Sequence, residues 1–536
     1  MKTLVKGQKY IEYCIFAGVF LILCFFLARY TVYTLDSDAS SELVLAKLLS
    51  QEGRLLTEDW LYGSELRVFY SQLIFTPLFS VFDSWRALRF TGTLIMLIAL
   101  VLAFYWFCRE TDSRRCFALG AMLMLLPLSR IYFDVLYKFT YYLPHAVMGF
   151  AVPAAVWSYA RRKGEGRRGR ARLLLALGLL LSFAVGLNGM RLLLTLYGPM
   201  LLSALLMLWL DRDAPGDRGF LAGCAAVSLA AVCGCAVNVL YLSRKYTLLD
   251  VTGIDFTAFS FEGLEQVLGG LLQAFGYRSG EEVFSLSLLY CALGGALFAL
   301  SLYASFAILK NRRAYSRGQE FTALFYLSSL AALCLLYCMT SMVFTLRYMV
   351  QAAVLGLLPI VVCFRQREVY GRTGNLLLVG LCCFALLCGA VHYNEMRKED
   401  KTGAQRECAD FLAEAGYTQG YASFWNGNVL TELSDGALEL WVWDEKFAQL
   451  TDPDEIVGFL QAKSHLRPPE EGKVFVLLSA NEDYYCEFAR NFRDENVIFK
   501  TENYETGALD EYIVYGFESY EEMRSQFCGV EEGESR

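Results

Sequence analysis

Two aspartates follow directly on the first long apolar run of this 536-residue chain, in the stretch TLDSDASSELVLAKLLSQEG (34–53). Asp36 and Asp38 stand where the run ends, and Glu42 lies one helical turn further on. Carboxylates at a bilayer edge suit two kinds of chemistry: deprotonating an attacking hydroxyl, or holding a divalent cation such as Mg²⁺ or Mn²⁺ near a phosphate. The competing explanation is helix capping, because Asp and Ser are favoured N-cap residues.

Two arginines border apolar runs on what we predict to be the same side of the membrane. Arg191 stands in LNGMRLLLTLYGP, at a turn between two predicted spans. Arg347 and Tyr348 stand in TSMVFTLRYMVQ, where another span begins. A guanidinium pairs bidentately with phosphate, and a cation at a membrane edge is a functional candidate, so both arginines are candidate phosphate ligands. Snorkelling to lipid headgroups is the alternative.

Other polar residues of this side are candidates for binding an acceptor or supporting the site. His145, in YYLPHAVMG, is a candidate base, although a hydrogen-bonded structural histidine is the commoner case. Tyr348 follows the candidate phosphate ligand directly, and Glu42 shares a segment with the aspartates. The first loop also carries an acidic and aromatic cluster: Glu58, Asp59, Trp60, Tyr62 and Glu65.

The elements that must position these residues are membrane spans. The chain is 56% hydrophobic, and runs of roughly eighteen or more apolar residues, enough to cross a bilayer, recur along most of it. The fourteen-residue run 69–82, broken by Pro77, is short for a span, and we expect it to be interfacial or re-entrant. We predict eleven spans, near 11–33, 88–107, 116–136, 141–160, 173–193, 195–210, 219–242, 283–309, 320–343, 346–364 and 373–391.

The basic loops predict the orientation, because Lys and Arg concentrate in cytoplasmic loops. Placing them all inside puts the N-terminus in the cytoplasm and the chain end outside the cell membrane. The first outward loop is then 34–87, and it carries the aspartates. We expect its apolar positions 43, 45, 48 and 49 to make an amphipathic helix on the membrane surface. The basic segments are the N-terminus, 109–115, 160–172, 210–218, 310–319 and 365–372.

The composition changes after residue 392, which divides the chain into a multi-span region (1–392) and a tail (393–536). The tail carries 31 acidic and 13 basic residues, a sign that argues against nucleic acid or anionic lipid as its partner. Its alternating helical and strand patterns predict an outward α/β domain, in which we expect DEIVGFLQAK (454–463) to be a helix. The fold class is therefore a polytopic α-helical membrane protein with a C-terminal soluble α/β domain.

An acidic first loop after the first span, a surface helix, and an Arg-Tyr pair before a Pro-containing span resemble the GT-C glycosyltransferases. This superfamily includes the protein O-mannosyltransferases and the aminoarabinose transferases of lipid A. The resemblance implies that Asp36 or Asp38 serves glycosyl transfer, although the family's common Asp-Glu-Ala becomes Asp38-Ala39-Ser40 here. It also implies that Arg347, with Arg191, contacts the lipid phosphate.

The resemblance implies an inverting transfer of a hexosyl or pentosyl group from a polyprenyl-phosphate donor to an acceptor hydroxyl outside the membrane. The expected partners are this donor, membrane lipids, and a cell-envelope glycan, lipid or protein as acceptor, with no nucleic acid. A transporter or lipid flippase is the first alternative, but transporters place ionisable residues near the bilayer midplane, and these spans carry almost none there. A polymerase or ligase of surface polysaccharide is the second.

Overall fold

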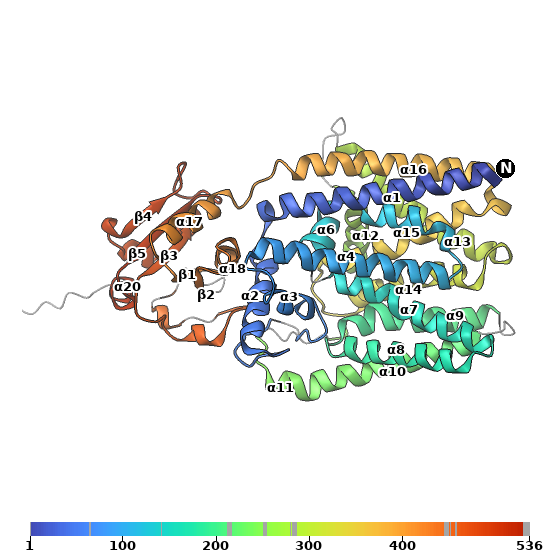
Figure 1. The fold of residues 1–536 in the computed structure, drawn as a ribbon, viewed down its shortest axis with the longest axis horizontal. Helices are drawn as coiled ribbons and strands as arrows, with labels where there is room; N and C mark the ends of the chain where they lie inside the picture. Colours follow the sequence, from blue (N-terminus) through green and yellow to red (C-terminus); the bar gives the residue numbers. More distant parts are fainter. Residues whose placement is uncertain are drawn as a thin grey trace, which may run out of the picture.

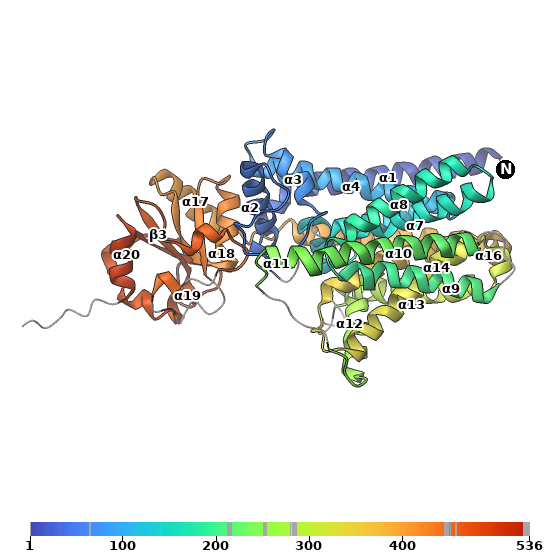
Figure 2. The ribbon, with the colours of Figure 1, turned by 90° about the horizontal axis from the view of Figure 1, so that it is seen from below.

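A long helical bundle carries a small α/β unit on one of its ends (Figures 1 and 2). We call this the docking end, and the other, where the N-terminus lies, the opposite end. The computed structural model describes residues 2–63, 66–140, 142–211, 217–249, 255–278, 280, 287–443, 450, 452–455 and 458–528.

Within this described part of the chain, nine helices are long and apolar enough to cross a membrane, and each coincides with a predicted span. The chain is therefore a multi-pass membrane protein. The long helices of the bundle are α1 (Lys2–Tyr30), α4 (Trp85–Glu110), α7 (Leu143–Gly164), α8 (Arg168–Gly186), α9 (Gly198–Leu210), α10 (Asp217–Val237), α13 (Ser287–Lys310), α14 (Arg317–Met339), α15 (Met349–Arg365) and α16 (Arg367–Met396).

The two remaining predicted spans differ from simple rods. Span 141–160 is α7, whose 22 residues extend about 33 Å, although its end carries three basic residues. Span 116–136 is a broken pair: α5 (Phe117–Leu125) is followed after a short break by Arg130–Lys138, at an angle of 107°. The break matters for function, because its second arm ends in a π-helical turn at the docking end.

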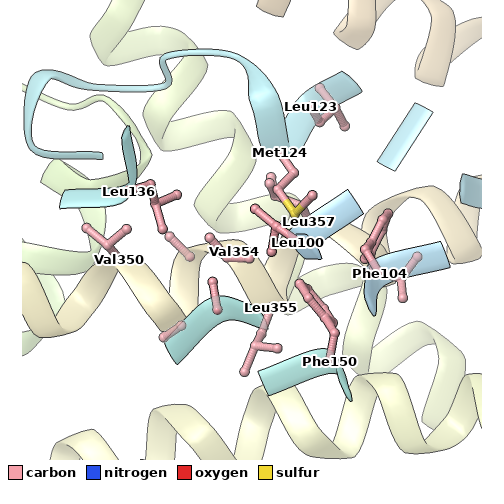
Figure 3. Packing of buried hydrophobic residues seen from close by; sticks show 14 of the residues in the cluster. Leu100, Phe104, Leu123, Met124, Leu136, Phe150, Val350, Val354, Leu355 and Leu357 are labelled. Atoms are coloured by element: carbon pink, nitrogen blue, oxygen red, sulfur yellow. The ribbon is translucent and has the colours of Figure 1, made fainter. Parts of the chain in front are cut away.

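Helix α15 lies at the centre of the bundle and is almost entirely buried. Figure 3 shows its residues Val350, Val354 and Leu357 packed against side chains of α4, α5 and α7, among them Leu100 and Phe150. Helices that are apolar all round are expected in such a position. This packing fixes the position of the first turn of α15. Arg347 and Tyr348 lie in the 3-10 turn directly before it.

The basic segments gather at the opposite end of the bundle. Arg365 pairs with Glu12 and donates to the carbonyl of Arg115, while Arg161 lies 3.8 Å from Asp112. Loops far apart in sequence therefore share one end with the N-terminus (Figure 1). This is the arrangement that the positive-inside rule requires if that end faces the cytoplasm.

Three short helices build the docking end: α2 (Ser37–Glu52), α3 (Gln72–Leu78) and α12 (Phe261–Phe275). Helix α3 has seven residues, too few to cross a bilayer. The predicted surface helix is α2, but its environment was predicted wrongly. Leu43, Leu45 and Leu49 are buried against protein, because α2 is sandwiched between the bundle and the C-terminal unit rather than lying on lipid.

The C-terminal unit is a five-stranded mixed sheet with helices packed around it, in the strand order β2-β1-β3-β5-β4. Strands β1, β2 and β3 pair in parallel, and β5 is antiparallel to both β3 and β4. The elements are α17 (Gly403–Glu414), β1 (Gln419–Ser423), α18 (Phe424–Leu433), β2 (Glu439–Trp443), β3 (Val474–Ser479), α19 (Ala480–Tyr485), β4 (Val497–Lys500), β5 (Tyr512–Phe517) and α20 (Tyr520–Phe527).

The predicted helix 454–463 is wrong for the residues described there. Leu460 has a φ of 51°, in the left-handed region that a helix cannot accommodate. The Gln461 amide instead exchanges two hydrogen bonds with the backbone of Val442, at 2.8 and 2.9 Å. These bonds fasten the segment beside the edge strand β2 in an irregular conformation, so tertiary contacts override its amphipathic pattern.

Candidate active site

A cavity of about 220 Å³ opens at the docking end, and we call it the α2 cavity. Residues from the first loop, from the bundle and from the C-terminal unit share its wall. A concave site with a few convergent charged groups is the usual form of a small-molecule site. It is lined by Asp38, Ser41, Glu42, Leu45, Trp60, Tyr62, Gly63, Arg67, Gln72, Tyr142, Arg191, Thr345, Arg347, Tyr348, Phe459 and Leu460.

The two predicted aspartates have different surroundings. Asp36 is the N-cap of α2, where its carboxylate accepts from the backbone N–H of Ala39 at 3.0 Å, and it also pairs with Lys138 at 3.1 Å. Asp38 lies in the first turn of α2 and faces the cavity, where Arg347 donates to its Oδ2 at 2.9 Å. The capping explanation therefore fits Asp36, whereas Asp38 is the carboxylate of the cavity wall.

Arg347 and Arg191 converge on the same cavity from different elements. Arg347 sits in the 3-10 turn Leu346–Tyr348 before α15, and Arg191 precedes the π-helical turn Leu193–Tyr197. The Arg191 guanidinium lies 4.5 Å from the ring centre of Tyr348 and donates to the Tyr142 hydroxyl at 3.0 Å. A cation–π contact of this kind stabilises the position of the guanidinium against the ring in the cavity wall.

Glu42 forms a hydrogen-bonded cluster in the cavity floor. Its carboxylate accepts from Arg67 at 2.9 Å, from the Ser71 hydroxyl at 2.7 Å and from the Gln72 amide. Glu42 therefore fixes Arg67, the third arginine of the cavity wall.

Tyr62 is another first-loop residue that lines the cavity. Its side chain is buried, and its hydroxyl donates to the carbonyl of Thr57 at 3.2 Å. Burial raises the pKa of Tyr62 to about 12, so the phenol stays neutral. It is a rigid wall residue.

Trp60 of the predicted cluster lines the α2 cavity, whereas Glu58, Asp59 and His145 do not. Glu58 pairs with Lys245 at 3.1 Å on the surface, and Asp59 accepts from the backbone N–H of Ser464 at 2.9 Å, so it fastens the C-terminal unit. His145 is buried between two tyrosine rings and lines a small adjoining cavity of about 20 Å³ behind Arg191. Glu65 lies outside the described residues.

Sequence reasoning missed several contributors, among them Arg67, Lys138 and the C-terminal residues that line the cavity. Lys138, at the end of the π-helical turn Asp134–Lys138, reaches Asp36 from inside the bundle and is almost fully buried. It is a cation at the docking end, as Arg191 and Arg347 are, and that signal was available in the sequence. The C-terminal unit contributes Phe459 and Leu460 to the cavity wall, and no sequence pattern pointed to them.

The residues suggested for a divalent cation do not form a ligand set. Asp36 and Asp38 face different cations, and no group of three or more His, Cys, Asp or Glu side chains in the described part of the chain could hold a metal ion.

No protein-family model matches this chain, and no curated protein matches its sequence. The structure resembles ArnT from Cupriavidus metallidurans in the apo state, with a TM-score of 0.54 and 12% identity over 95% of this chain and 98% of that chain. ArnT bound to undecaprenyl phosphate gives a TM-score of 0.49 at 11% identity, over 94% of this chain and 97% of that one. An oligosaccharyltransferase of Archaeoglobus fulgidus, in complex with Zn and sulfate, gives 0.49 at 12%, over 88% and 69%.

Of these three likenesses, the first has a TM-score above 0.5, and it extends over nearly the whole of both chains. At 12% identity such a match establishes the fold and leaves the chemistry to the site. ArnT is an aminoarabinose transferase of the GT-C superfamily. The chain shares the fold of ArnT over nearly its whole length.

Proposed function

We propose that this protein is an inverting glycosyltransferase that moves a sugar from a polyprenyl-phosphate donor to an acceptor hydroxyl at the membrane surface. The single observation that carries the proposal is the Asp38–Arg347 pair. It joins a carboxylate and a guanidinium in one open cavity, although they are 309 residues apart in the chain. Those two groups are the base and the phosphate ligand that such a transfer needs.

In the proposed reaction the donor phosphate takes the place of Asp38 beside Arg347. Arg191 and Arg67 add positive charge on the same wall, which favours a bound phosphodiester. The exchange frees the Asp38 carboxylate at the moment when the sugar carbon arrives next to it. Asp38 and Arg347 have side-chain exposures of 21% and 36%, so breaking their pair leaves neither charge buried.

The bonds formed and broken balance among the acceptor, the lipid donor and Asp38. The acceptor oxygen attacks the anomeric carbon, and the bond from that carbon to the phosphate oxygen breaks. The hydroxyl proton passes to Asp38, and polyprenyl phosphate leaves with its negative charge beside Arg347. One displacement inverts the anomeric configuration, and Asp36 keeps α2 in place through its cap and its pair with Lys138.

The fold supports this choice of donor. ArnT, whose fold is similar, has been crystallised with undecaprenyl phosphate. We extend that ligand class to the α2 cavity. The acceptor would meet the opposite wall, where Phe459 and Leu460 provide an apolar surface.

A direct test is to incubate the purified chain with a panel of undecaprenyl-phosphate hexoses and pentoses and measure released undecaprenyl phosphate. Release that depends on an added cell-envelope acceptor is the expected result. A flippase would move the lipid across vesicles without cleaving it, and a polymerase would lengthen a lipid-linked glycan. Release that persists after chelation speaks against a divalent cation held by Asp36 and Asp38.

We also propose that the docking end faces outward and that the opposite end, where the basic segments gather, faces the cytoplasm, as the positive-inside rule predicts. The C-terminal unit offers a natural probe, because Cys528 is exposed whereas Cys408 and Cys486 are buried. A membrane-impermeant maleimide should label the wild-type chain in intact cells and fail with Cys528→Ser. Labelling that appears in wild type only after lysis would reverse the orientation.

A further inference from the structure

A second cavity, also of about 220 Å³, lies at the docking end and shares no lining residue with the first. We call it the α1–α4 cavity, because the C-terminal end of α1 and the N-terminal end of α4 form its walls, with α17 and α18 closing it. The apolar part of the wall includes Leu27, Leu35 and Phe90.

A buried arginine with unused donors faces this cavity. Arg89 is 4% exposed, and its Nε and Nη2 are engaged by Glu432 and by the carbonyl of Ala39. Its Nη1 is buried with no hydrogen-bond partner among the described residues. An unpaired buried donor costs about 1–3 kcal/mol, and more when it is charged. An acceptor is therefore missing beside Arg89.

A second arginine stands at the mouth of the same cavity. Arg86 is exposed and donates from Nη2 to the carbonyl of Ala28, at the end of α1, at 3.0 Å. It pairs with no carboxylate in the part of the chain that the structure describes. The acidic residues of the cavity are already engaged: Glu432 by Arg89, and Asp435 by the backbone N–H of Trp85 at 2.6 Å. Arg406 is likewise held by Asp400.

The surroundings identify the kind of ligand. Below the cavity, α1 and α4 expose large apolar side chains, among them Leu21, Phe25, Ile98 and Leu102, as lipid-facing helices do. The arginines of the cavity are thus at the level of the lipid headgroups, and the exposed apolar side chains of α1 and α4 are at the level of the acyl chains. The forked donors of a guanidinium match the oxygens of a phosphate, which is the anionic group of phospholipids at this level.

We infer that the α1–α4 cavity binds the phosphate of a membrane lipid, with Arg86 and the free Nη1 of Arg89 as its ligands and the acyl chains against α1 and α4. The inference concerns a site separate from the α2 cavity and does not rest on the transfer reaction. Its consequence is that one lipid joins α1, α4 and α18.

The experiment uses the full chain, delipidated in detergent, with phosphatidic acid, phosphatidylglycerol, phosphatidylcholine and inorganic phosphate as separate probes. Native mass spectrometry counts bound lipid, and the thermal midpoint reports stabilisation. We expect one anionic phospholipid to be retained and its apparent affinity to fall about tenfold in Arg86→Gln, the loss expected for one charge-assisted hydrogen bond. Equal stabilisation by inorganic phosphate would support the phosphate site and assign it to the free anion.

The matched control is Arg29→Gln, an exposed arginine at the same end of α1 that does not line the cavity and should bind lipid as wild type does. A second variant, Arg89→Met with Glu432→Met, removes the buried pair without leaving a lone charge and should fold but lose the lipid. Lipid retention that is the same in wild type, Arg86→Gln and the double variant would overturn the inference.

Discussion

The two cavities of the docking end have equal volumes and both contain an arginine–carboxylate pair, yet the pairs differ in burial. In the α2 cavity, Arg347 and Asp38 have side-chain exposures of 36% and 21%. In the α1–α4 cavity, the side chains of Arg89 and Glu432 are 5% and 3% exposed, with a second contact at 2.6 Å between Nη2 and Oε2. An exposed pair contributes little to stability, while breaking a buried pair strands a charge.

This difference separates an exchangeable pair from a permanent one. Arg347 can leave Asp38 for a ligand at small cost, which is what a donor site requires. Arg89 cannot leave Glu432, so it can only offer the donors that Glu432 does not use. The buried pair instead holds α18 of the C-terminal unit to α4 of the bundle. Neither of its residues lines the α2 cavity.

The largest expected effect comes from removing the charge of Asp38. Asp38→Asn should lower the rate of sugar transfer by two to four orders of magnitude, the usual loss with a general base. The midpoint of thermal unfolding should stay close to wild type, because Arg347 is partly exposed and keeps access to solvent when the pair is lost.

Asp36→Asn is the matched comparison, since Asn caps helices as well as Asp does. It should keep α2 folded and reduce transfer less than Asp38→Asn. If Asp36→Asn abolishes transfer while Asp38→Asn does not, Asp36 is the base and the assignment by cavity position is wrong.

The next effect is on stability and concerns the permanent pair. Arg89→Ala should lower the free energy of unfolding by about 3–5 kcal/mol, because Glu432 is left buried and uncompensated. Differential scanning fluorimetry of the purified chain measures this change. Arg67→Ala, in the other cavity, removes a more exposed arginine of the Glu42 cluster and should cost less; equal losses would erase the distinction between the two pairs.

A smaller effect is expected at the donor ligand. Arg347→Ala should raise the KM for the lipid donor about ten- to a hundredfold, which corresponds to one hydrogen bond between charged groups. Arg347→Lys should recover part of the loss, because an ammonium keeps the charge but lacks the fork. An unchanged donor KM in both variants would remove Arg347 from the donor site.

The smallest effect is expected at Leu460, whose left-handed backbone places it in the cavity wall. Leu460→Asn keeps a residue type that tolerates this conformation and removes the apolar surface. Stability should change by less than about 1 kcal/mol, while the KM for the acceptor rises severalfold. Leu466→Asn, an exposed leucine outside the cavity, is the control.

The membrane spans were predictable because each must satisfy its own backbone in lipid, which makes hydropathy a local signal. From the sequence, Asp38 and Arg347 could be predicted to lie on the same side of the membrane, but not to be in contact. The contact itself depends on how α2 docks, and that is set by the C-terminal unit. Lys138 was missed because its run DVLYKFT reads as apolar, although a π-helical turn aims it at Asp36.

The C-terminal segment 454–463 shows the limit of periodicity. Its pattern is helical, but the Gln461 amide finds backbone partners on β2, and those contacts exist only in the folded unit. Periodicity alone does not show whether the helix or the contacts with β2 are more stable. The cap at Asp36, in contrast, depends on residues adjacent in sequence, and it was anticipated as an alternative.

The α2 cavity is built from Asp38 near the start of the chain and Leu460 near its end. About 420 residues separate the two, so at a synthesis rate of about 5–20 residues per second the ribosome needs roughly 20 to 80 seconds to make both walls. During that interval the carboxylates of the first loop have been made, but the residues of the C-terminal unit that line the same cavity have not. The wall that we propose for the acceptor, formed by Phe459 and Leu460, is therefore added only after the arginines that we propose for the donor have been made.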